Sequence, residues 1–199
     1  NNGQSCIAAK RFVAVKSIVK EFTRLFSEKL AAKKVGDPLA KLTEIGPMAR
    51  KDLRDLLHQQ VVKSIEAGAT CILGGEISEG ESAFYPPTIL TNVKKGMPAY
   101  DEELFGPVAA IITAADEWDA IRVANDSNFG LGAAVFTQNI KKGEEIAAKF
   151  LQAGSCFVNA LVKSDPRLPF GGIKESGYGR ELGAYGIKEF MNIKTVYIR

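Results

Sequence analysis

Short apolar runs alternate with amphipathic stretches in the second half of the chain. Residues 107–113 (PVAAIIT), 133–137 (AAVFT) and 155–160 (SCFVNA) are apolar runs typical of buried strands, and residues 116–126 and 141–152 between them have helical spacing. Strands joined by single helices and short loops pair in parallel through right-handed crossovers. The pattern therefore predicts an α/β fold, a layered domain with a mostly parallel central sheet flanked by helices.

The first half of the chain begins with a strand and a helix. Residues 11–16 (RFVAVK) read as a strand, and residues 18–34 have apolar positions at helical spacing before Gly36-Asp37-Pro38 ends the pattern. The predicted apolar face of this helix is Ile18, Phe22, Leu25, Phe26 and Leu30.

A second amphipathic helix is predicted over residues 49–67, and two short strands follow it. Its predicted inward positions are Leu53, Leu56, Leu57, Val61 and Ile65. Residues 70–75 (TCILGG) read as a short buried strand closed by two glycines. Residues 85–90 (YPPTIL) contain two prolines, which favours a place at the edge of a sheet.

Both ends of the chain suggest that it belongs with further protein segments. The sequence starts at Asn1 without a methionine, so we expect a fragment of a longer protein. Residues 193–199 alternate like a strand, with no neighbouring segment to form a hairpin. An unpaired strand of this kind favours pairing with another domain or subunit.

Composition and charge exclude several classes of protein. The 26 Lys and Arg residues and 23 Asp and Glu residues are scattered, so the net charge of +3 does not indicate nucleic-acid or membrane binding. No apolar run approaches the ~20 residues of a membrane helix. The three cysteines are far apart, which argues against a disulfide framework or a structural zinc site. We expect no metal and a reducing compartment, the cytoplasm.

The glycine-rich segments do not match phosphate-binding motifs. The pairs Gly130/Gly132 and Gly177/Gly179 lack the third glycine of the dinucleotide fingerprint, because Val135 and Leu182 stand there. Tyr178 occupies the lysine position of a P-loop that would start at Gly172. The sequence therefore gives no nucleotide site of these two types.

Cys6 is a candidate nucleophile, although a small packed residue is the simpler interpretation. A neutral thiol needs a neighbouring histidine, a helix N-terminus or another positive field to become reactive. The single histidine, His58, falls beside the apolar stripe of the 49–67 helix, where we expect it to be exposed and without a role. A helix starting at residues 5–7 would favour the thiolate and direct the Cys6 N–H toward an oxyanion. Cys71 and Cys156 lie in apolar runs and are predicted core thiols.

A base for such a thiol could be a carboxylate. Asp101, Glu102 and Glu103 precede an aromatic residue and a Gly-Pro turn in DEELFGPV. On residue type alone this acidic group could house a general base, or it could be solvated surface.

Three segments in this order give a more specific indication. NNGQSC, EELFGPV and PFGGIKESGYGRELG resemble signature segments of the NAD(P)-dependent aldehyde dehydrogenase superfamily, and the similarity extends to EFMNIKTVYI at the end. The whole chain, residues 1–199, resembles the C-terminal catalytic domain of such an enzyme. The resemblance implies an oxidoreductase in which Cys6 attacks an aldehyde, the adduct passes a hydride to NAD or NADP, and water hydrolyses the resulting thioester.

The resemblance also assigns roles to individual residues. The backbone N–H of Cys6 would form half of an oxyanion hole, and Ser5 and Ile7 would line the aldehyde pocket. Glu103 would bind the nicotinamide-ribose hydroxyls and Phe105 would position the nicotinamide, so the acidic group would hold cofactor instead of acting as a base.

The PFGG loop is expected to select the substrate. Phe170 would border the substrate channel. VKSDPRLPFGG resembles succinate-semialdehyde dehydrogenase-like members, in which the serine at the position of Ser164 binds the distal carboxylate. Lys163 and Arg167 add positive charge to the same loop, although all three side chains could simply be solvated. After the loop, the glycines of SGYGRELG suggest a tight turn into a helix, and Arg180 and Glu181 are predicted to form structural ion pairs.

Parts of the family's machinery have no counterpart in this chain. The resemblance places the general-base glutamate, the second oxyanion donor and the N-terminal cofactor-binding domain in sequence before Asn1, so we expect these 199 residues to be inactive alone. It also implies a small-molecule aldehyde substrate and a homo-oligomer, a dimer or tetramer. Two alternatives stay open: an acylating or acyl-phosphate-using relative with the same cysteine, and an inert folded interaction module.

Overall fold

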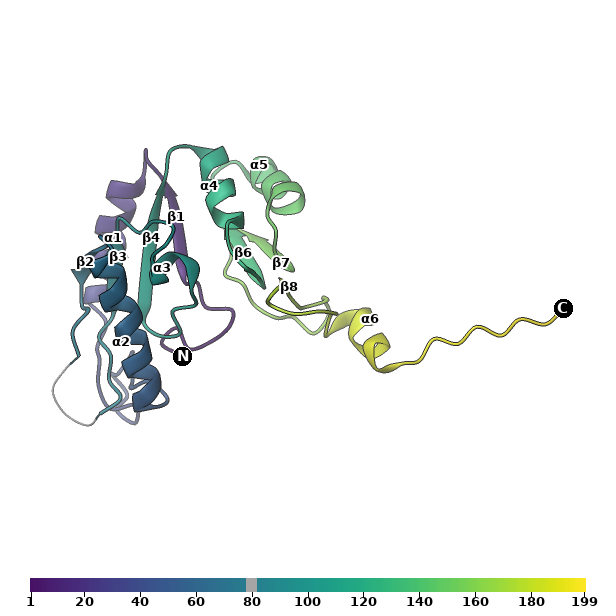
Figure 1. Ribbon diagram of the computed structural model, residues 1–199, viewed down its shortest axis with the longest axis horizontal. Helices are drawn as coiled ribbons and strands as arrows, with labels where there is room; N and C mark the ends of the chain where they lie inside the picture. The colour runs from purple at the N-terminus through teal and green to yellow at the C-terminus, as the bar shows by residue number, and fades with distance from the viewer. Residues whose placement is uncertain (78–81) are drawn as a thin grey trace. The chain divides into compact units, whose positions relative to one another are not determined.

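The computed structural model describes residues 1–77 and 82–199. The chain forms two compact units, Asn1–Ala124 and Asn125–Arg199, each of which is described by itself (Figure 1). The assignment of all 199 residues to one domain stays a prediction.

The first unit is built on a four-stranded sheet in the order β1-β4-β3-β2. Its strands are β1 (Arg11–Val15), β2 (Thr70–Leu73), β3 (Thr88–Thr91) and β4 (Val108–Ala114). β4 pairs in parallel with β1 and with β3, and β2 pairs antiparallel with β3. The predicted α/β class with a mostly parallel sheet is confirmed.

Helices α1 (Val19–Ala31) and α2 (Lys51–Glu66) cover the two faces of this sheet (Figure 1). Successive residues of a strand point to opposite faces. On β4, Ile111 packs in the cluster that includes Phe22 and Phe26 of α1, whereas Ile112 belongs to the cluster of Leu57 on α2. The rings of Phe12 and Phe26 lie 4.9 Å apart between centroids. Two shorter helices complete the unit's elements, α3 (Pro98–Asp101) and α4 (Glu117–Asn125).

The predicted apolar faces of α1 and α2 are partly wrong. Four predicted inward positions are more than a third exposed: Ile18, Leu25, Leu56 and Ile65. Polar residues of α2 are buried instead, because they find partners. Arg54 donates hydrogen bonds to the Ser82 carbonyl and to the Asp55 carboxylate, and the Ser64 hydroxyl accepts the Ala99 N–H at 2.9 Å. A satisfied polar group can be buried at little cost.

The places of the two short strands are reversed relative to the prediction. β3 lies inside the sheet, and its first three residues, Thr88, Ile89 and Leu90, are buried, whereas β2 is the half-exposed edge strand. The prolines at 86 and 87 come just before β3, so they remove no N–H from its ladder. The first N–H that the strand needs belongs to Thr88, which donates to the Pro107 carbonyl at 2.9 Å.

The second unit contains two small sheets. β6 (Gly132–Val135) pairs in parallel with β7 (Ser155–Val158), and the connection between them holds α5 (Ile140–Glu145) and the π-helical segment η1 (Ile146–Phe150). This confirms the predicted crossover from residues 133–137 to 155–160. The predicted parallel pairing of residues 107–113 with 133–137 is wrong, because β4 pairs with β1 and β3, whereas β6 forms a separate two-stranded sheet with β7. β5 (Phe129–Gly130) pairs antiparallel with β8 (Ile173–Lys174), and α6 (Gly183–Gly186) leads into the 3-10 helix η2 (Ile187–Phe190).

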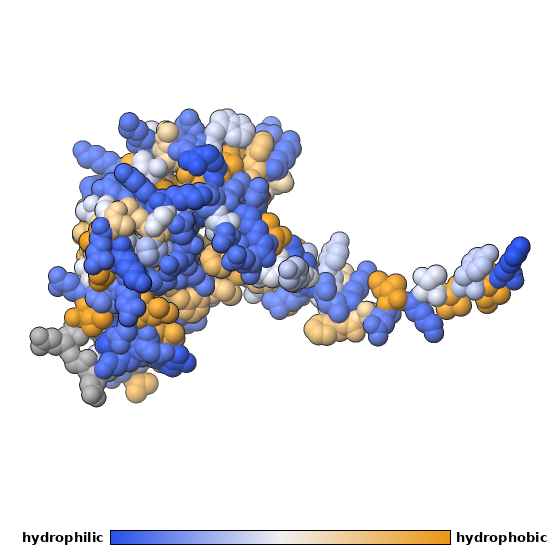
Figure 2. Space-filling model, viewed as in Figure 1, coloured by the Kyte–Doolittle hydropathy of each residue, from blue (hydrophilic) through white to orange (hydrophobic). Residues whose placement is uncertain are grey.

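The last nine residues, 191–199, form no helix or strand in the described structure. Apolar side chains along this segment are exposed, and Figure 2 shows the aliphatic ones in orange. They include Ile193, Val196, Tyr197 and Ile198, each more than 70% exposed. The segment has no partner strand within residues 1–77 and 82–199. Among the same residues, no helix has both the length and the apolarity to cross a bilayer.

Candidate active site

Cys6 lies in a tight turn that precedes β1. The N–H of Gln4 donates to the Asn1 carbonyl at 2.8 Å, and the N–H of Ala8 donates to the Ser5 carbonyl at 3.0 Å. Residues 1–18, all of which are described, contain no helix, so the predicted helix start at residues 5–7 is wrong. The reason is the pairing of β1 with β4, which begins at Lys10, whose carbonyl accepts the Ala110 N–H at 3.2 Å. An extended strand that close to Cys6 leaves room for one turn only.

Two polar side chains of the NNGQSC loop fasten it to the segment before α2. The Asn2 side-chain amide donates to the Gly46 carbonyl at 2.9 Å, and the Gln4 side-chain carbonyl accepts the Ala49 N–H at 2.8 Å. Sequence reasoning missed both residues, since their partners are more than 40 positions away. Asn2 and Gln4, which both precede the thiol, therefore anchor the loop to residues 46–49.

The same loop touches the turn of EELFGPV through two glycines. A Cβ atom added at Gly3 would overlap the carbonyl oxygen of Gly106, so the backbones meet in van der Waals contact there. Gly3 also has a φ of +75°, which L side chains rarely adopt. Gly106 is buried, and Leu104 beside it is 1% exposed. The thiol loop and the predicted cofactor turn are thus one packed structure.

Lys10 joins these two segments. Its Nζ donates hydrogen bonds to the carbonyls of Gly3 and Ser5, the latter at 2.9 Å, and lies 4.7 Å from the centroid of the Phe105 ring. Burial lowers the pKa of the Lys10 ammonium, and the charges of Glu103 and Cys6 partly oppose this effect. The sequence analysis does not single out Lys10. The available signal is that Lys10 is a cation four residues after a thiol that has no histidine near it in the sequence.

The structure therefore brings Cys6, Glu103 and Phe105 together around one ammonium group. The Cys6 thiol is exposed, with Ser5 and Ile7 half-buried on either side. Glu103 is exposed and Phe105 is 38% exposed, so the carboxylate and the ring are open to a ligand. An exposed nucleophile beside an open ring and carboxylate is an arrangement that can accept a small carbonyl compound and a hydroxylated cofactor.

The other thiols and the histidine have surroundings of a different kind. Cys71 and Cys156 are half-buried, so they are not fully core residues as predicted, and burial raises the pKa of both thiols. His58 is half-buried, and its Nδ1 lies 3.3 Å from the hydroxyl of the buried Tyr85. The prediction that His58 is exposed is therefore wrong, and the ring is engaged by a residue outside the thiol loop.

A sequence profile of the aldehyde dehydrogenase family matches residues 1–196 of this chain. The chain belongs to the aldehyde dehydrogenase family. It is 49% identical over 197 residues to the NAD(P)+ succinate semialdehyde dehydrogenase Sad of Escherichia coli (strain K12), covering 99% of this chain and 42% of that protein.

Other members of the family are similar to this chain over its whole length. A probable NADP+ succinate-semialdehyde dehydrogenase of Synechocystis is 48% identical, with 100% of this chain and 43% of that protein covered. The crystal structure of a succinic semialdehyde dehydrogenase from Streptococcus pyogenes in complex with NADP+ matches with a TM-score of 0.94 and 38% identity, over 99% of this chain and 43% of that one. The chain therefore spans about two fifths of the length of the family members that it matches.

The predicted substrate residues lie on the loop that follows β7. Ser164 is exposed, whereas Phe170 is buried and forms an isolated bridge with Glu181. Arg167 is engaged by a neighbour, because its guanidinium donates to both carboxylate oxygens of Asp165 at 2.9 and 2.6 Å. This pairing lowers the pKa of Asp165 to about 2. The positive charge that the sequence assigns to this loop is thus partly neutralised within it.

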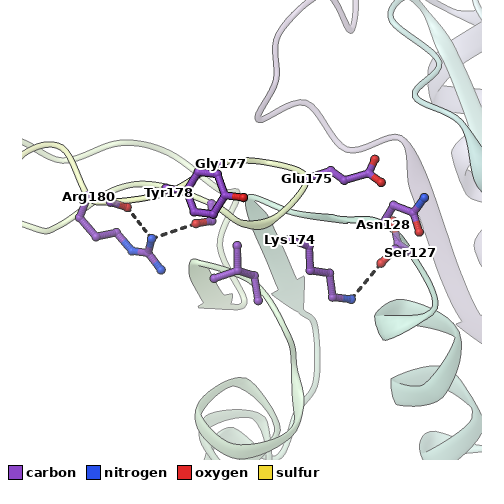
Figure 3. A pocket seen from close by; sticks show the side chains of 10 residues that line it. Ser127, Asn128, Lys174, Glu175, Gly177, Tyr178 and Arg180 are labelled. Carbon is purple, nitrogen blue, oxygen red and sulfur yellow. Dashed lines mark hydrogen bonds between the residues drawn. The ribbon is translucent and has the colours of Figure 1, made fainter.

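The glycine-rich family segment around residues 172–180 lines an open hollow of about 830 Å³ (Figure 3). The two cations at its rim bind backbone oxygens. Lys174 Nζ donates to the carbonyls of Asn125 and Ser127, and Arg180 donates to those of Gly172 and Gly179. Arg180 thus binds carbonyls in place of the predicted ion pair. None of the predicted site residues lines the hollow, and Lys174 and Arg180 there bind backbone carbonyls of the chain.

Proposed function

We propose that this chain is the thiol-bearing catalytic part of an NAD(P)-dependent aldehyde dehydrogenase, with Cys6 as the nucleophile. One observation carries the proposal: the exposed Cys6 stands on a loop that Lys10 and Gly3 hold against the turn bearing Glu103 and Phe105. Family membership, with relatives named as succinate-semialdehyde dehydrogenases, supports the same chemistry.

In the proposed reaction the Cys6 thiolate adds to the aldehyde. A C–S bond forms while the carbonyl π pair moves to oxygen, and the backbone N–H of Cys6 donates a hydrogen bond to that oxyanion. As the oxyanion collapses, the carbon loses its hydride to the acceptor that the nicotinamide cofactor would supply, and a thioester on Cys6 results. Water then gives a proton to a general base, its oxygen attacks the thioester carbon, the C–S bond breaks, and the carboxylic acid leaves with the thiolate restored.

The residues present fit a nicotinamide cofactor. When bound, NAD or NADP supplies the hydride acceptor for this chemistry. The exposed Glu103 carboxylate would accept hydrogen bonds from the nicotinamide-ribose hydroxyls, and the open Phe105 ring would set the position of the nicotinamide. Glu103 and Phe105 stand on either side of the buried Leu104, which anchors the turn that presents them.

The proposed substrate is succinate semialdehyde. A distal carboxylate calls for a hydroxyl and a cation, and Ser164 with Lys163 supplies both in exposed positions. Ser5 and Ile7 would line the pocket at the reacting end, and Phe170 would border the channel. Because Asp165 already binds the Arg167 guanidinium, we assign the distal contact to Ser164 in preference to Arg167.

The test uses aldehydes with and without a terminal carboxylate on the full-length enzyme. Ser164→Ala should lower kcat/KM about tenfold for succinate semialdehyde and leave an uncharged aldehyde of similar length unchanged, since one hydrogen bond to a charged group is lost. Ser17→Ala, at an exposed serine of the turn before α1, is the matched control. An equal loss for both substrates would contradict the proposed role of Ser164.

The chain alone should bind NAD(P) weakly and show no turnover. It matches about two fifths of its relatives' length, and we propose that the general base and the second oxyanion donor are not among its residues. Measurable aldehyde oxidation by the 199 residues would contradict this proposal.

We further propose that residues 193–199 pair as a strand with another domain or subunit of a homo-oligomer. Their exposed apolar side chains support this assignment. Three free cysteines are compatible with the proposed cytoplasmic location.

A further inference from the structure

A reactive cysteine usually has a histidine or the N-terminus of its own helix beside it, and Cys6 has neither of these within its loop. No helix begins within residues 1–18, so Cys6 does not sit at the start of a helix of its own segment. His58 lies on α2 and contacts Tyr85. The cation that touches the thiol loop is Lys10, which the proposed mechanism does not use.

Lys10 is attached to both sides of the proposed reaction site. Its ammonium binds the carbonyls of Gly3 and Ser5, so it closes the loop immediately before Cys6. The same ammonium stands over the Phe105 ring at 4.7 Å, within the range of a cation–π interaction. A single side chain therefore fixes the thiol loop relative to the ring that is proposed to position the cofactor.

We propose that Lys10 is a positioning residue that holds the Cys6 loop against Phe105 and favours the Cys6 thiolate through its positive charge. This inference rests on the proposed function, in which Cys6 is the nucleophile. A cation near a thiol favours the ionised form, which is the nucleophile. Carbonyl oxygens and an aromatic face leave that charge unneutralised, because neither carries a formal charge.

Two other charged groups influence Lys10, and they have to be considered together. Glu103 on the neighbouring turn and Cys6 on the loop both raise the pKa of the ammonium, against a larger lowering by burial. Glu103 therefore competes with the thiolate for the same cation. Glu103 is exposed, so water screens its charge, whereas Lys10 is half-buried at the loop.

The test measures how fast iodoacetamide alkylates each cysteine of the 199-residue chain, by mass spectrometry of the separate peptides over pH 5 to 10. Lys10→Met keeps the length of the side chain and removes the charge, and Lys10→Arg keeps the charge. We expect Lys10→Met to slow the alkylation of Cys6 about tenfold near neutral pH, the order that one nearby charge produces. The pH of half-maximal rate should rise, and Lys10→Arg should retain most of the rate.

Salt gives an independent readout. Iodoacetamide is neutral, so raising NaCl from about 0.05 to about 1 M should slow Cys6 in the unmodified chain by screening and leave Lys10→Met almost unaffected. A role confined to loop shape would not produce this difference. If Lys10→Met is unstable, the unmodified chain alone is still informative, because a Cys6 rate that does not fall with salt would overturn the role of the charge.

The outcomes separate this inference from the proposed function. If Cys6 of the unmodified chain reacts no faster than Cys71 and Cys156, the nucleophile assignment fails and the inference fails with it. If Cys6 reacts faster but Lys10→Met and salt leave its rate and pH profile unchanged, only the inference fails. Equal slowing by Lys10→Met and Lys10→Arg would overturn the role of the charge.

Discussion

At the scale of residues, the site depends on short contacts between two segments that are about 100 positions apart. Gly3 meets Gly106, and Lys10 meets Phe105. The resemblance of NNGQSC and EELFGPV to family segments predicts which residues matter, but not how they meet. The helix start expected at Cys6 does not exist, because the backbone is already committed to β1 at residue 11.

The contact at Gly3 gives a direct prediction. Gly3→Ala would place a Cβ on the Gly106 carbonyl at a positive φ, and Gly96→Ala is the matched control, because Gly96 has a φ of +93° and nothing within 4 Å of the added Cβ. We expect Gly96→Ala to cost about 1 kcal/mol of stability from backbone strain alone. Gly3→Ala should in addition detach the loop and change the alkylation rate of Cys6 several-fold. Identical behaviour of Cys6 in both variants would show that the close approach is unimportant.

The pair of Asp165 and Arg167 predicts a pH dependence. Because the guanidinium lowers the pKa of Asp165 to about 2 in the folded chain, the pair favours folding above the ordinary unfolded-state value. This contribution is lost as the pH falls from about 4 toward 2. An NMR titration of the Asp165 carboxyl carbon should give a midpoint near 2, and Arg167→Ala should move it toward the ordinary value. A midpoint that Arg167→Ala leaves in place would contradict the pairing.

At the scale of elements, the sequence predicts the existence and type of the segments better than their place in the sheet. The strands at 11–16, 107–113, 133–137 and 155–160 and the helices at 18–34, 49–67 and 116–126 are all found, with shifted ends. The predicted edge position of residues 85–90 is wrong because Pro86 and Pro87 precede the paired residues of β3 and do not lie among them. Apolar periodicity also misplaced Leu56 and Ile65, since tertiary partners made Arg54 and Ser64 the buried residues.

The corrected order of strands can be tested with one residue type. Ile89 on β3 is 0% exposed and Ile72 on β2 is 43% exposed. Ile89→Ala should lower the free energy of unfolding by about 2 to 5 kcal/mol, because it leaves a cavity inside the sheet, and Ile72→Ala by less than about 1 kcal/mol. Urea denaturation of both variants measures the difference. Equal losses, or a greater loss at Ile72, would restore β2 as the buried strand.

At the scale of the whole molecule, the chain spans about two fifths of the length of the family members that it matches. The thiol, the cofactor-contacting residues and the carboxylate-binding serine are proposed here, and the relatives are more than twice as long. Residues 193–199 have exposed apolar side chains, and we propose that this segment pairs with another domain or subunit. What the chain is proposed to contribute is therefore the covalent step at Cys6.

Trapping that covalent step is the most direct test of the account. The full-length enzyme would be mixed with succinate semialdehyde and NADP+, quenched in acid during turnover, digested, and analysed by mass spectrometry. The account predicts that the peptide containing Cys6 carries one succinyl group as a thioester, that Cys71 and Cys156 carry none, and that Cys6→Ser shows neither adduct nor turnover. Turnover by Cys6→Ser, or a succinyl group on another cysteine, would contradict it.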